Sequence, residues 1–170
     1  MADDAFLSAL VAEHGRWLMA FLRGLVGDAT DAEDAFQETW LRIFRARGDF
    51  RRDGVRTYLA KTARSVVIDR LRRTRPTGSL DAADDSVGAD ALADEAPDPS
   101  AVFESKATAE DVRRAIAALP FGWRQVVLLR IEGEMEFKDI AAELGIPLGT
   151  ALTWMRRATV ELKRKLGGAR

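Results

Sequence analysis

Hydrophobic residues recur at helical spacing in two blocks of the chain, and a polar stretch separates the blocks. The first block predicts helices over residues 4–26, from about residue 31 to residue 44, and over residues 55–73. The first of these helices carries one apolar stripe, formed by Leu7, Leu10, Val11, Leu18, Phe21, Leu22 and Leu25. Thr30 and Glu33 have the spacing of a capping box, which favours the start of the second helix at that point.

The second block continues the helical periodicity to the end of the chain. It predicts a short helix ended by Pro120, an apolar helix over residues 126–131, and two further helices over residues 137–144 and 148–166. Neither block contains a segment with the alternating pattern of a β-strand. The sequence therefore predicts an all-α fold.

The polar stretch between the blocks, residues 77–106, is rich in Ala and Asp and contains few large apolar residues. A segment of this kind cannot bury enough apolar surface to order itself, so we expect a flexible acidic linker. The predicted architecture is thus two small helical domains, residues 1–76 and 107–170, and we expect them to move independently in the free protein.

The junction between the last two predicted helices has the chemistry of a helix-turn-helix. Gly145 can adopt the left-handed conformation that ends the first of these helices, and small Ala141 allows close approach of the second. An ordinary pair of antiparallel helices is the alternative. Because the turn chemistry and both apolar patterns agree, the sequence favours a DNA-binding domain.

The last predicted helix has one face suited to a core and another suited to DNA. The core face is formed by Leu148, Ala151, Met155, Ala158, Leu162 and Leu166. The opposite face and its flank carry Thr150, Thr153, Trp154, Arg156 and Arg157. Threonine hydroxyls and arginine side chains can read base edges or hold phosphates. Trp154 is ambiguous, since contact with DNA or a partner and partial burial are equally compatible with its position.

Charge is strongly segregated, although the whole chain carries a net charge of −1. Residues 41–75 carry a net charge of +9 and residues 113–170 carry +5, whereas residues 1–40 and 76–112 carry −6 and −9. One basic block would be compatible with a solvated helix face. Two basic blocks separated by an acidic spacer favour a nucleic-acid partner.

The third predicted helix carries a basic face. Lys61, Arg64 and Arg72 lie on that face, and the aromatic residues Phe50 and Tyr58 lie beside it. Basic side chains near aromatic rings suit single-stranded nucleic acid, because the charges follow phosphates while the rings stack on unpaired bases. Packing of Tyr58 in the core is an equally good interpretation of the pattern alone.

Three segments of the chain, in this order, resemble the extracytoplasmic-function (ECF) sigma factors of the sigma-70 family. Residues 31–44 (DAEDAFQETWLRIF) resemble the segment that docks on the clamp helices of RNA polymerase core. Residues 57–73 resemble the next segment, which grips and melts the minus-ten promoter element. Residues 119–166 resemble region four, which binds the minus-thirty-five element as a duplex. The resemblance implies a transcription initiation factor whose partners are polymerase core and promoter DNA, both duplex and single-stranded.

The resemblance also assigns roles to individual residues. The positions that match the polymerase-docking segment are Asp31, Glu33, Asp34, Gln37, Glu38 and Arg42. Ser65 matches a position near the flipped minus-ten base, and Arg130 matches a contact to the DNA backbone. The sequence departs from the family where Trp154 replaces a frequent arginine and where Tyr58 and Ala60 replace frequent larger aromatic residues. Whether an anti-sigma factor is a further partner is left open by the sequence.

Other classes of function have little support. The chain has no cysteine and a single histidine, His14, beside an apolar stripe. It carries no phosphate-binding glycine loop and no metal-spaced cluster, so we expect neither an enzyme nor a cofactor or metal site. The apolar runs of the chain are too short to span a bilayer, and its first residues lack the basic character of a leader. We therefore expect a cytoplasmic protein with no membrane contact. A stand-alone helix-turn-helix regulator is the alternative function.

Overall fold

The computed structural model describes residues 2–46, 54–74 and 107–167. The N-terminal unit contains α1 (Ala2–Val26), α2 (Ala29–Arg45) and α3 (Val55–Thr74). The C-terminal unit contains α4 (Ala109–Ala117), α5 (Phe121–Ile131), α6 (Phe137–Leu144) and α7 (Leu148–Gly167). The predicted all-α fold is confirmed and each predicted helix is present, although α5 begins at Phe121, before its predicted start at residue 126.

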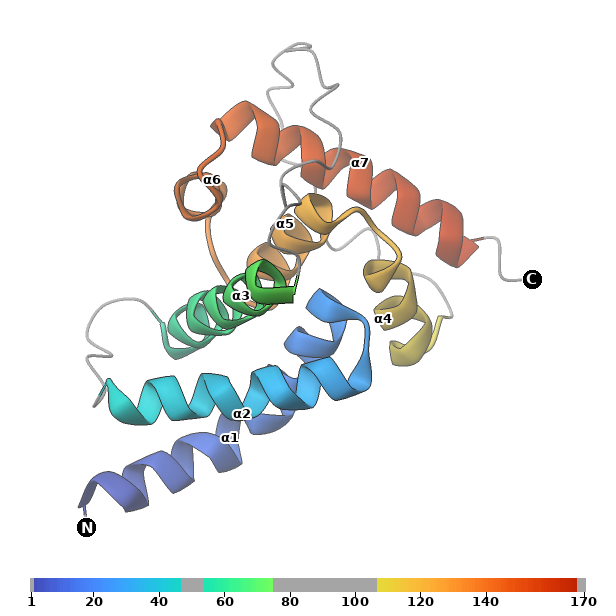
Figure 1. Cartoon of the computed structure of the whole chain (residues 1–170). Coiled ribbons are helices and arrows are strands. Elements are labelled where there is room, and N and C mark those ends of the chain that lie inside the picture. The colour runs from blue at the N-terminus through green and yellow to red at the C-terminus, as the bar shows by residue number, and fades with distance from the viewer. Residues whose placement is uncertain (1, 47–53, 75–106, 168–170) are drawn as a thin grey trace.

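The helices of the N-terminal unit pack against one another in the lower part of the molecule as drawn in Figure 1. Their buried apolar residues include Leu10, Leu18, Phe21, Leu22, Leu25, Ala32, Ile43, Leu59, Ala63, Val66 and Val67. Thr39 is buried among them, and its hydroxyl donates to the backbone oxygen of Ala35 at 2.6 Å. Because that hydrogen bond satisfies the hydroxyl, a polar residue is tolerated in this core.

Helix α5 lies at the centre of the molecule, between the N-terminal unit and α7 (Figure 1). It contacts α1 on one side and α7 on the other. Val126, Val127, Leu128 and Leu129 are all buried as a result. A helix that is covered on several sides must be apolar on several sides, which explains why its sequence is a continuous apolar run rather than a stripe.

Side-chain caps fix the starts of two helices. Thr108 and Asp111 form a capping box at α4, in which each side chain accepts from the backbone N–H of the other residue. The start of α2 differs from the prediction, because Asp28 caps it and Thr30 does not. Oδ1 of Asp28 accepts from the backbone N–H of Asp31 at 3.0 Å. A carboxylate is favoured there because its charge is stabilised by the positive end of the helix dipole.

Buried residues of the two units belong to one hydrophobic core cluster, so the units are packed together in this structure. Helix α1 approaches α5 closely at Gly24, where a Cβ atom would lie 3.1 Å from a methyl carbon of Leu128. Helix α3 approaches the turn after α5, where a Cβ atom on Gly133 would lie 3.3 Å from that of Ala60. Small residues outside the apolar stripes allow this packing, so helical periodicity did not reveal it. The predicted linker lies outside the described residues.

Two apolar residues that were predicted to lie on core stripes are exposed instead, and Phe44 near the end of α2 is exposed as well. Val11, Phe44 and Leu148 are 39%, 53% and 47% exposed. Leu148 is the first residue of α7, and burial on this helix begins only at Ala151, one turn later. Val11 and Phe44 line an open groove between α1 and α2.

Candidate nucleic-acid and protein interfaces

The turn between α6 and α7 has the geometry of a helix-turn-helix. Gly145 has φ 68° and ψ 32°, the left-handed conformation that the sequence predicted. Its backbone N–H donates to the oxygen of Ala142 at 3.3 Å, and that of Ile146 donates to Ala141 at 3.0 Å, which closes the end of α6. The carbonyl of Pro147 then accepts from two amides in the first turn of α7. These bonds fix the direction in which α7 leaves the turn.

Helix α7 buries one face in the core and presents the other at the surface. The residues predicted to read or hold DNA are at least partly exposed on it: Thr150, Thr153, Arg156 and Arg157. Farther along the helix, Arg164 donates to Glu161 at 2.6 and 3.0 Å, and this hydrogen bonding lowers the pKa of Glu161 to about 2. The N-terminal half of α7 therefore offers polar groups to a ligand, whereas Arg164 already has an acidic partner.

Two of the predicted DNA contacts have structural partners in the C-terminal unit. Trp154 packs against α5, where a Cβ atom on Gly122 would lie 2.5 Å from the Trp154 ring. Nη1 of Arg130 donates to the backbone oxygen of Met135 at 3.0 Å, and its guanidinium lies 5.4 Å from the centroid of the Phe137 ring. Trp154 is thus a half-buried packing residue, and Arg130 ties α5 to the start of α6.

Arg64, on the predicted basic face of α3, is held by two helices of the C-terminal unit. Its Nε donates to Oε1 of Gln125 on α5 at 2.6 Å, and its Nη1 donates to Oε1 of Glu143 on α6 at 3.2 Å. About two helical turns before Arg64 on α3, the Thr57 hydroxyl donates to the backbone oxygen of Gly133 at 2.8 Å. The side chain of Arg64 is only 17% exposed as a result.

The remaining predicted residues of the basic face differ in exposure. Ser65 and Arg72 are exposed, whereas Lys61 and Tyr58 are half-buried. Tyr58 packs against the hydrophobic core with part of its surface, which leaves part of the ring accessible. Phe50 lies outside the described residues.

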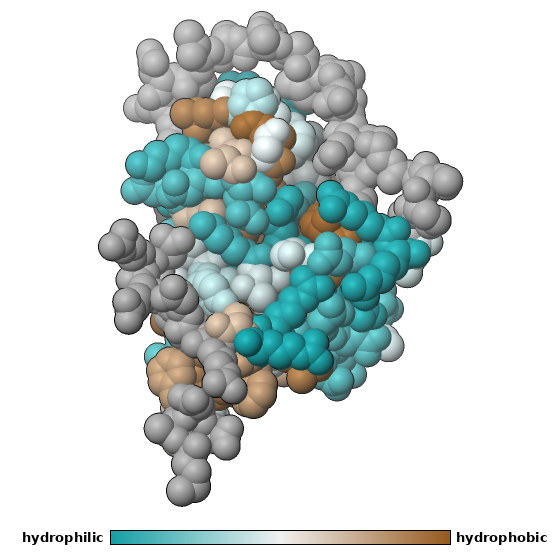
Figure 2. Space-filling model, turned by 60° about the vertical axis from the view of Figure 1, so that its left-hand side comes forward, coloured by the Kyte–Doolittle hydropathy of each residue, from teal (hydrophilic) through white to brown (hydrophobic). Residues whose placement is uncertain are grey.

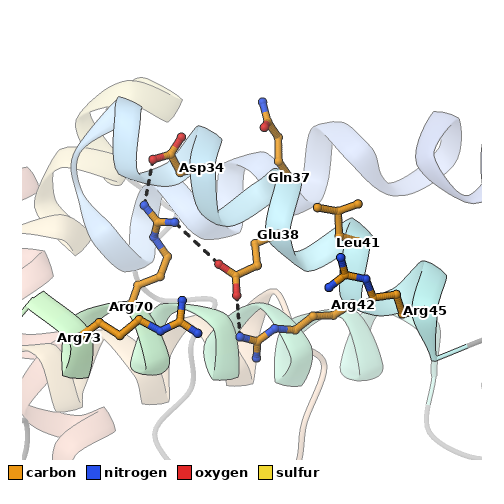
Figure 3. Close-up of a pocket in the computed structure, with 8 residues that line it drawn as sticks. All are labelled: Asp34, Gln37, Glu38, Leu41, Arg42, Arg45, Arg70 and Arg73. Atoms are coloured by element: carbon orange, nitrogen blue, oxygen red, sulfur yellow. Dashed lines mark hydrogen bonds and ion pairs between the residues drawn. The ribbon is translucent and has the colours of Figure 1, made fainter.

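Acidic residues of α2 and basic residues of α3 face each other across an open groove (Figure 3). Arg42 donates to Glu38 at 2.6 Å and to Asp69 at 2.9 Å. Arg70 lies 2.9 Å from Asp34 and 3.7 Å from Glu38. Three of the residues predicted to dock a partner therefore belong to a network that holds α2 against α3.

The acidic partners in this network stabilise the positive charge of its central arginine, Arg42. Burial on its own lowers the pKa of Arg42, but the hydrogen bonds and negative charges of Glu38 and Asp69 outweigh that effect and raise it. The predicted docking residues outside the network are exposed on α2: Asp31, Glu33 and Gln37. Gln37 also lines the groove, and Figure 3 shows its side chain on the side of α2 that faces away from α3. That outer face is available to another protein.

Figure 2 shows hydrophobic residues at the lower end of the molecule, below a broad hydrophilic face. The large exposed apolar side chains in the N-terminal unit lie near the start of α1 and the end of α2: Phe6, Val11, Leu41 and Phe44. Leu7, Val11 and Phe44 line the groove between these two helices. Apolar side chains gathered at one place on a surface indicate a contact with another protein.

Sequence reasoning missed the residues that hold Arg64. Its partners Gln125 and Glu143 lie 61 and 79 positions away along the chain. The available signal was Gln125 itself, a polar residue within the apolar run of α5 that is only 7% exposed. A buried amide must find a hydrogen-bond partner, but the sequence did not indicate which one.

The described helices include none that is long and apolar enough to cross a membrane. In the same ranges of the chain, no group of three or more acidic or histidine side chains is arranged to hold a metal ion.

Comparison with known proteins gives matches for both units. Sigma-70 region 2 matches residues 10–77, and sigma-70 region 4 matches residues 109–162. The ECF RNA polymerase sigma factor SigM of Mycobacterium tuberculosis is 31% identical, over 98% of this chain and 81% of SigM. The ECF RNA polymerase sigma factor RpoE of Cereibacter sphaeroides is 28% identical, over 96% of this chain and 88% of RpoE. SigE of Mycolicibacterium smegmatis, also an ECF RNA polymerase sigma factor, is 29% identical over 91% of this chain, which spans 59% of SigE.

Solved structures share the arrangement of helices. The sigma factor RpoE of Bartonella quintana, solved in complex with the anti-sigma factor NepR, has a TM-score of 0.67. The match is 20% identical and covers 96% of this chain and 98% of that chain. CnrH, solved with the cytosolic domain of CnrY, has a TM-score of 0.57 at 24% identity and covers 96% of this chain and 89% of that chain. At these identities the likeness concerns the fold.

Proposed function

The chain belongs to the sigma-70 family of RNA polymerase sigma factors, within its ECF group, and we propose that it directs polymerase core to specific promoters in the cytoplasm. The observation that carries the proposal is the presence of regions 2 and 4 in that order, with the polar half of α7 open at the surface. Such a factor supplies recognition and strand opening and leaves RNA synthesis to the polymerase. We therefore assign it no catalytic residue.

The two basic helices have different tasks in this proposal. Helix α7 enters the major groove of the minus-thirty-five element, where Thr153 and Arg157 read bases and Arg156 holds phosphate. Helix α3 acts at the minus-ten element, where Lys61 and Tyr58 follow and stack on the opened strand. Arg64, Ser65 and Arg72 of α3 and Thr150 of α7 extend these two contact surfaces. Trp154 of α7 packs against Gly122 of α5, and Arg130 of α5 contacts Met135 and the ring of Phe137 at the start of α6, so both residues brace the helix-turn-helix.

The outer face of α2 is the proposed docking surface for the clamp helices of polymerase core. Its exposed residues combine negative charge, at Asp31 and Glu33, with an apolar side chain, Leu41, that is 51% exposed. An acidic face with an apolar centre is complementary to a basic coiled coil. Asp34, Glu38 and Arg42 position this face by holding α2 against α3.

Run-off transcription with purified polymerase core tests the function. We expect the protein to confer initiation at discrete start sites of genomic DNA, and core alone to give none of these transcripts. A stand-alone helix-turn-helix regulator is the alternative, and it would bind duplex DNA without binding core. Absence of both core binding and specific initiation would contradict the proposal.

The docking surface is tested with a charge placed at its centre. Leu41→Arg should weaken retention of core on the immobilised protein, because the new charge must be desolvated in the interface. Val160→Arg is the matched control, since Val160 is an exposed apolar residue on α7, in the other unit. Equal retention of core by the two variants would remove the face around Leu41 from the docking surface.

An anti-sigma factor is a further proposed partner, because the Bartonella quintana structure of similar fold contains one. Capture of a single protein by the immobilised chain, with loss of run-off activity when that protein is added back, would identify it.

A further inference from the structure

Gly149 is the second residue of α7 and lies on the side of this helix that faces away from the core. Thr153 and Arg156 follow on the same side, because residues four and seven positions apart share one face of an α-helix. Gly149 and Arg156 are exposed, and Thr153 is partly exposed. The glycine therefore begins the row of residues to which we assign contacts with the minus-thirty-five element.

The fold gives no reason for a glycine at this place. A Cβ atom on Gly149 would meet no other atom within 4 Å, and its φ lies outside the left-handed region. Other glycines of the C-terminal unit have clear reasons: Gly122 makes room for the ring of Trp154, Gly133 lies against the backbone of α5, and Gly145 has φ 68°. Within a helix, glycine is less stable than alanine because it loses more backbone freedom on folding. Gly149 thus weakens α7 without a compensating contact among the described residues.

The dimensions of duplex DNA give the missing side chain a use. The major groove is about 12 Å wide, and an α-helix with its side chains is about 10–12 Å across, so a helix enters the groove with little room to spare. The side chains on its outer face then decide how close its backbone comes to the base edges. In a helix-turn-helix, the N-terminal residues of the second helix contact the bases, and Gly149 lies in that first turn.

We propose that Gly149 is a positioning residue for promoter recognition: the absence of its side chain lets the first turns of α7 approach the base edges of the minus-thirty-five duplex closely enough for Thr153 to bond to them. The proposal rests on the sigma-factor function above, because that function places α7 in the major groove. A threonine hydroxyl is attached to Cβ, so it reaches only a short way from the backbone. A methyl group on residue 149, one turn earlier, would hold the backbone away and break this contact.

The stability of two pairs of variants tests whether the fold needs the glycine. Gly149→Ala and Gly149→Leu add a small and a large side chain. Gly167→Ala and Gly167→Leu are the matched controls, because Gly167 lies about five turns farther along the same side of α7 and a Cβ atom there also meets nothing within 4 Å. We expect Gly149→Ala to unfold at the same temperature as the wild type or at a higher one. A lower melting temperature would show that the glycine serves the fold, and would overturn the proposal.

Promoter affinity of the holoenzyme, reconstituted from polymerase core and each variant, is the functional measurement. Two duplexes are compared: a promoter fragment mapped by run-off transcription, and the same fragment with its minus-thirty-five element replaced. Gly149→Ala should weaken binding to the intact fragment about tenfold, as the loss of one base contact does, and leave binding to the replaced fragment unchanged. Gly149→Leu should weaken it further, and both Gly167 variants should bind like the wild type. Wild-type affinity of Gly149→Ala for the intact fragment, or an equal loss on both fragments, would overturn the proposal.

A double-mutant cycle tests whether the glycine acts through Thr153. Thr153→Ala should weaken binding to the intact promoter in the wild-type background. In the Gly149→Ala background it should have no further effect, because the contact is already broken. If the two losses are instead additive, Thr153 bonds to the bases whatever residue 149 is, and the positioning role is wrong.

The same measurements distinguish failure of this proposal from failure of the function on which it rests. If replacing the minus-thirty-five element leaves the affinity of the wild-type holoenzyme unchanged, α7 does not read that element, and both the proposed function of α7 and the role of Gly149 are wrong. If the replacement weakens the wild type while Gly149→Ala binds the intact promoter like the wild type, the function stands and only the role of Gly149 fails.

Discussion

Helices α3 and α7 are both 20 residues long and both carry basic residues that the sequence assigned to DNA, yet their surroundings differ. Helix α3 lies between neighbours: Arg70 and Asp69 pair with α2 on one side, and Arg64 bonds to α5 and α6 on the other. Helix α7 packs through one face only and keeps Arg156 exposed. A basic helical face is therefore a potential binding surface, and its neighbours decide whether it is available.

The difference assigns the two helices to different stages of promoter binding. The open face of α7 can meet duplex DNA without any rearrangement of the protein. On α3, Arg64 can meet a strand only after it leaves Gln125 and Glu143, which suits a contact made once the duplex has opened, whereas Ser65 and Arg72 are already exposed. Four predictions test this contrast.

The largest effect should come from the shared core. Leu18→Ala in the N-terminal unit and Leu162→Ala in the C-terminal unit should each lower the free energy of unfolding by about 2–5 kcal/mol, because both leucines are almost fully buried. If the units are closed in solution, Leu162→Ala should also speed hydrogen exchange in α1 to α3. The opposite result would be two separate unfolding transitions, with hydrogen exchange in α1 to α3 unchanged by Leu162→Ala. In that case the C-terminal unit does not cover α3, and the contrast between α3 and α7 is wrong.

The next largest effect concerns the open helix. Arg157→Ala should weaken binding to the promoter duplex by about 1–3 kcal/mol and weaken binding to a random duplex less, because a base contact is lost. Arg164→Ala is the control on the same helix, since Arg164 is already paired with Glu161. Gel-shift affinity for both duplexes is the measurement. Equal weakening for the two sequences would mean that Arg157 holds phosphate, and base reading would fall to Thr153 or Arg156.

The covered helix should respond at a later step. Tyr58→Ala should impair promoter opening more than initial duplex binding, because a ring gains a stacking partner only when bases are unpaired. A stacked base is worth about 1–3 kcal/mol, and the half-buried position of Tyr58 places the expected loss at the lower end. Permanganate reactivity of promoter thymines, measured beside gel-shift affinity, separates the two steps. A proportional loss in both would identify Tyr58 as a core residue only.

The smallest effect should come from the start of α4, the helix that packs on α1. Thr108→Ala removes the capping box and should lower stability by about 1 kcal/mol in thermal unfolding. The hydrogen bonds of Thr108, and then Arg114, hold the pKa of Asp111 below its usual value. A lowered carboxylate pKa stabilises the fold above the unfolded value, and that stabilisation is lost as the pH falls through the folded value. The difference in stability between the wild type and Thr108→Ala should therefore shrink as the pH drops below about 4, and the part due to the bond between the Asp111 backbone N–H and the Thr108 hydroxyl should remain. A constant difference across that range would show that Asp111 does not depend on Thr108.

The sequence by itself determined each helix, the helix-turn-helix and the segregation of charge. These features depend on neighbours three or four positions apart, or on one residue such as Gly145, whose left-handed conformation follows from its missing side chain. The cap of α2 was misplaced because Asp28 and Thr30 are both good caps, and the local sequence does not rank two such neighbours. The family resemblance supplied the assignment of the helices to polymerase, duplex and opened strand.

Only the tertiary structure decided which of these surfaces are covered. Arg64 finds Glu143 at a separation of 79 positions, and no local pattern links the two residues. The contacts of Gly24 with Leu128 and of Ala60 with Gly133 depend on the separation of the backbones that carry them. A change in that separation smaller than the width of a methyl group turns a contact into a clash. Periodicity specifies the direction in which a side chain points from its own helix. What that side chain meets is decided by the packing of all the helices together.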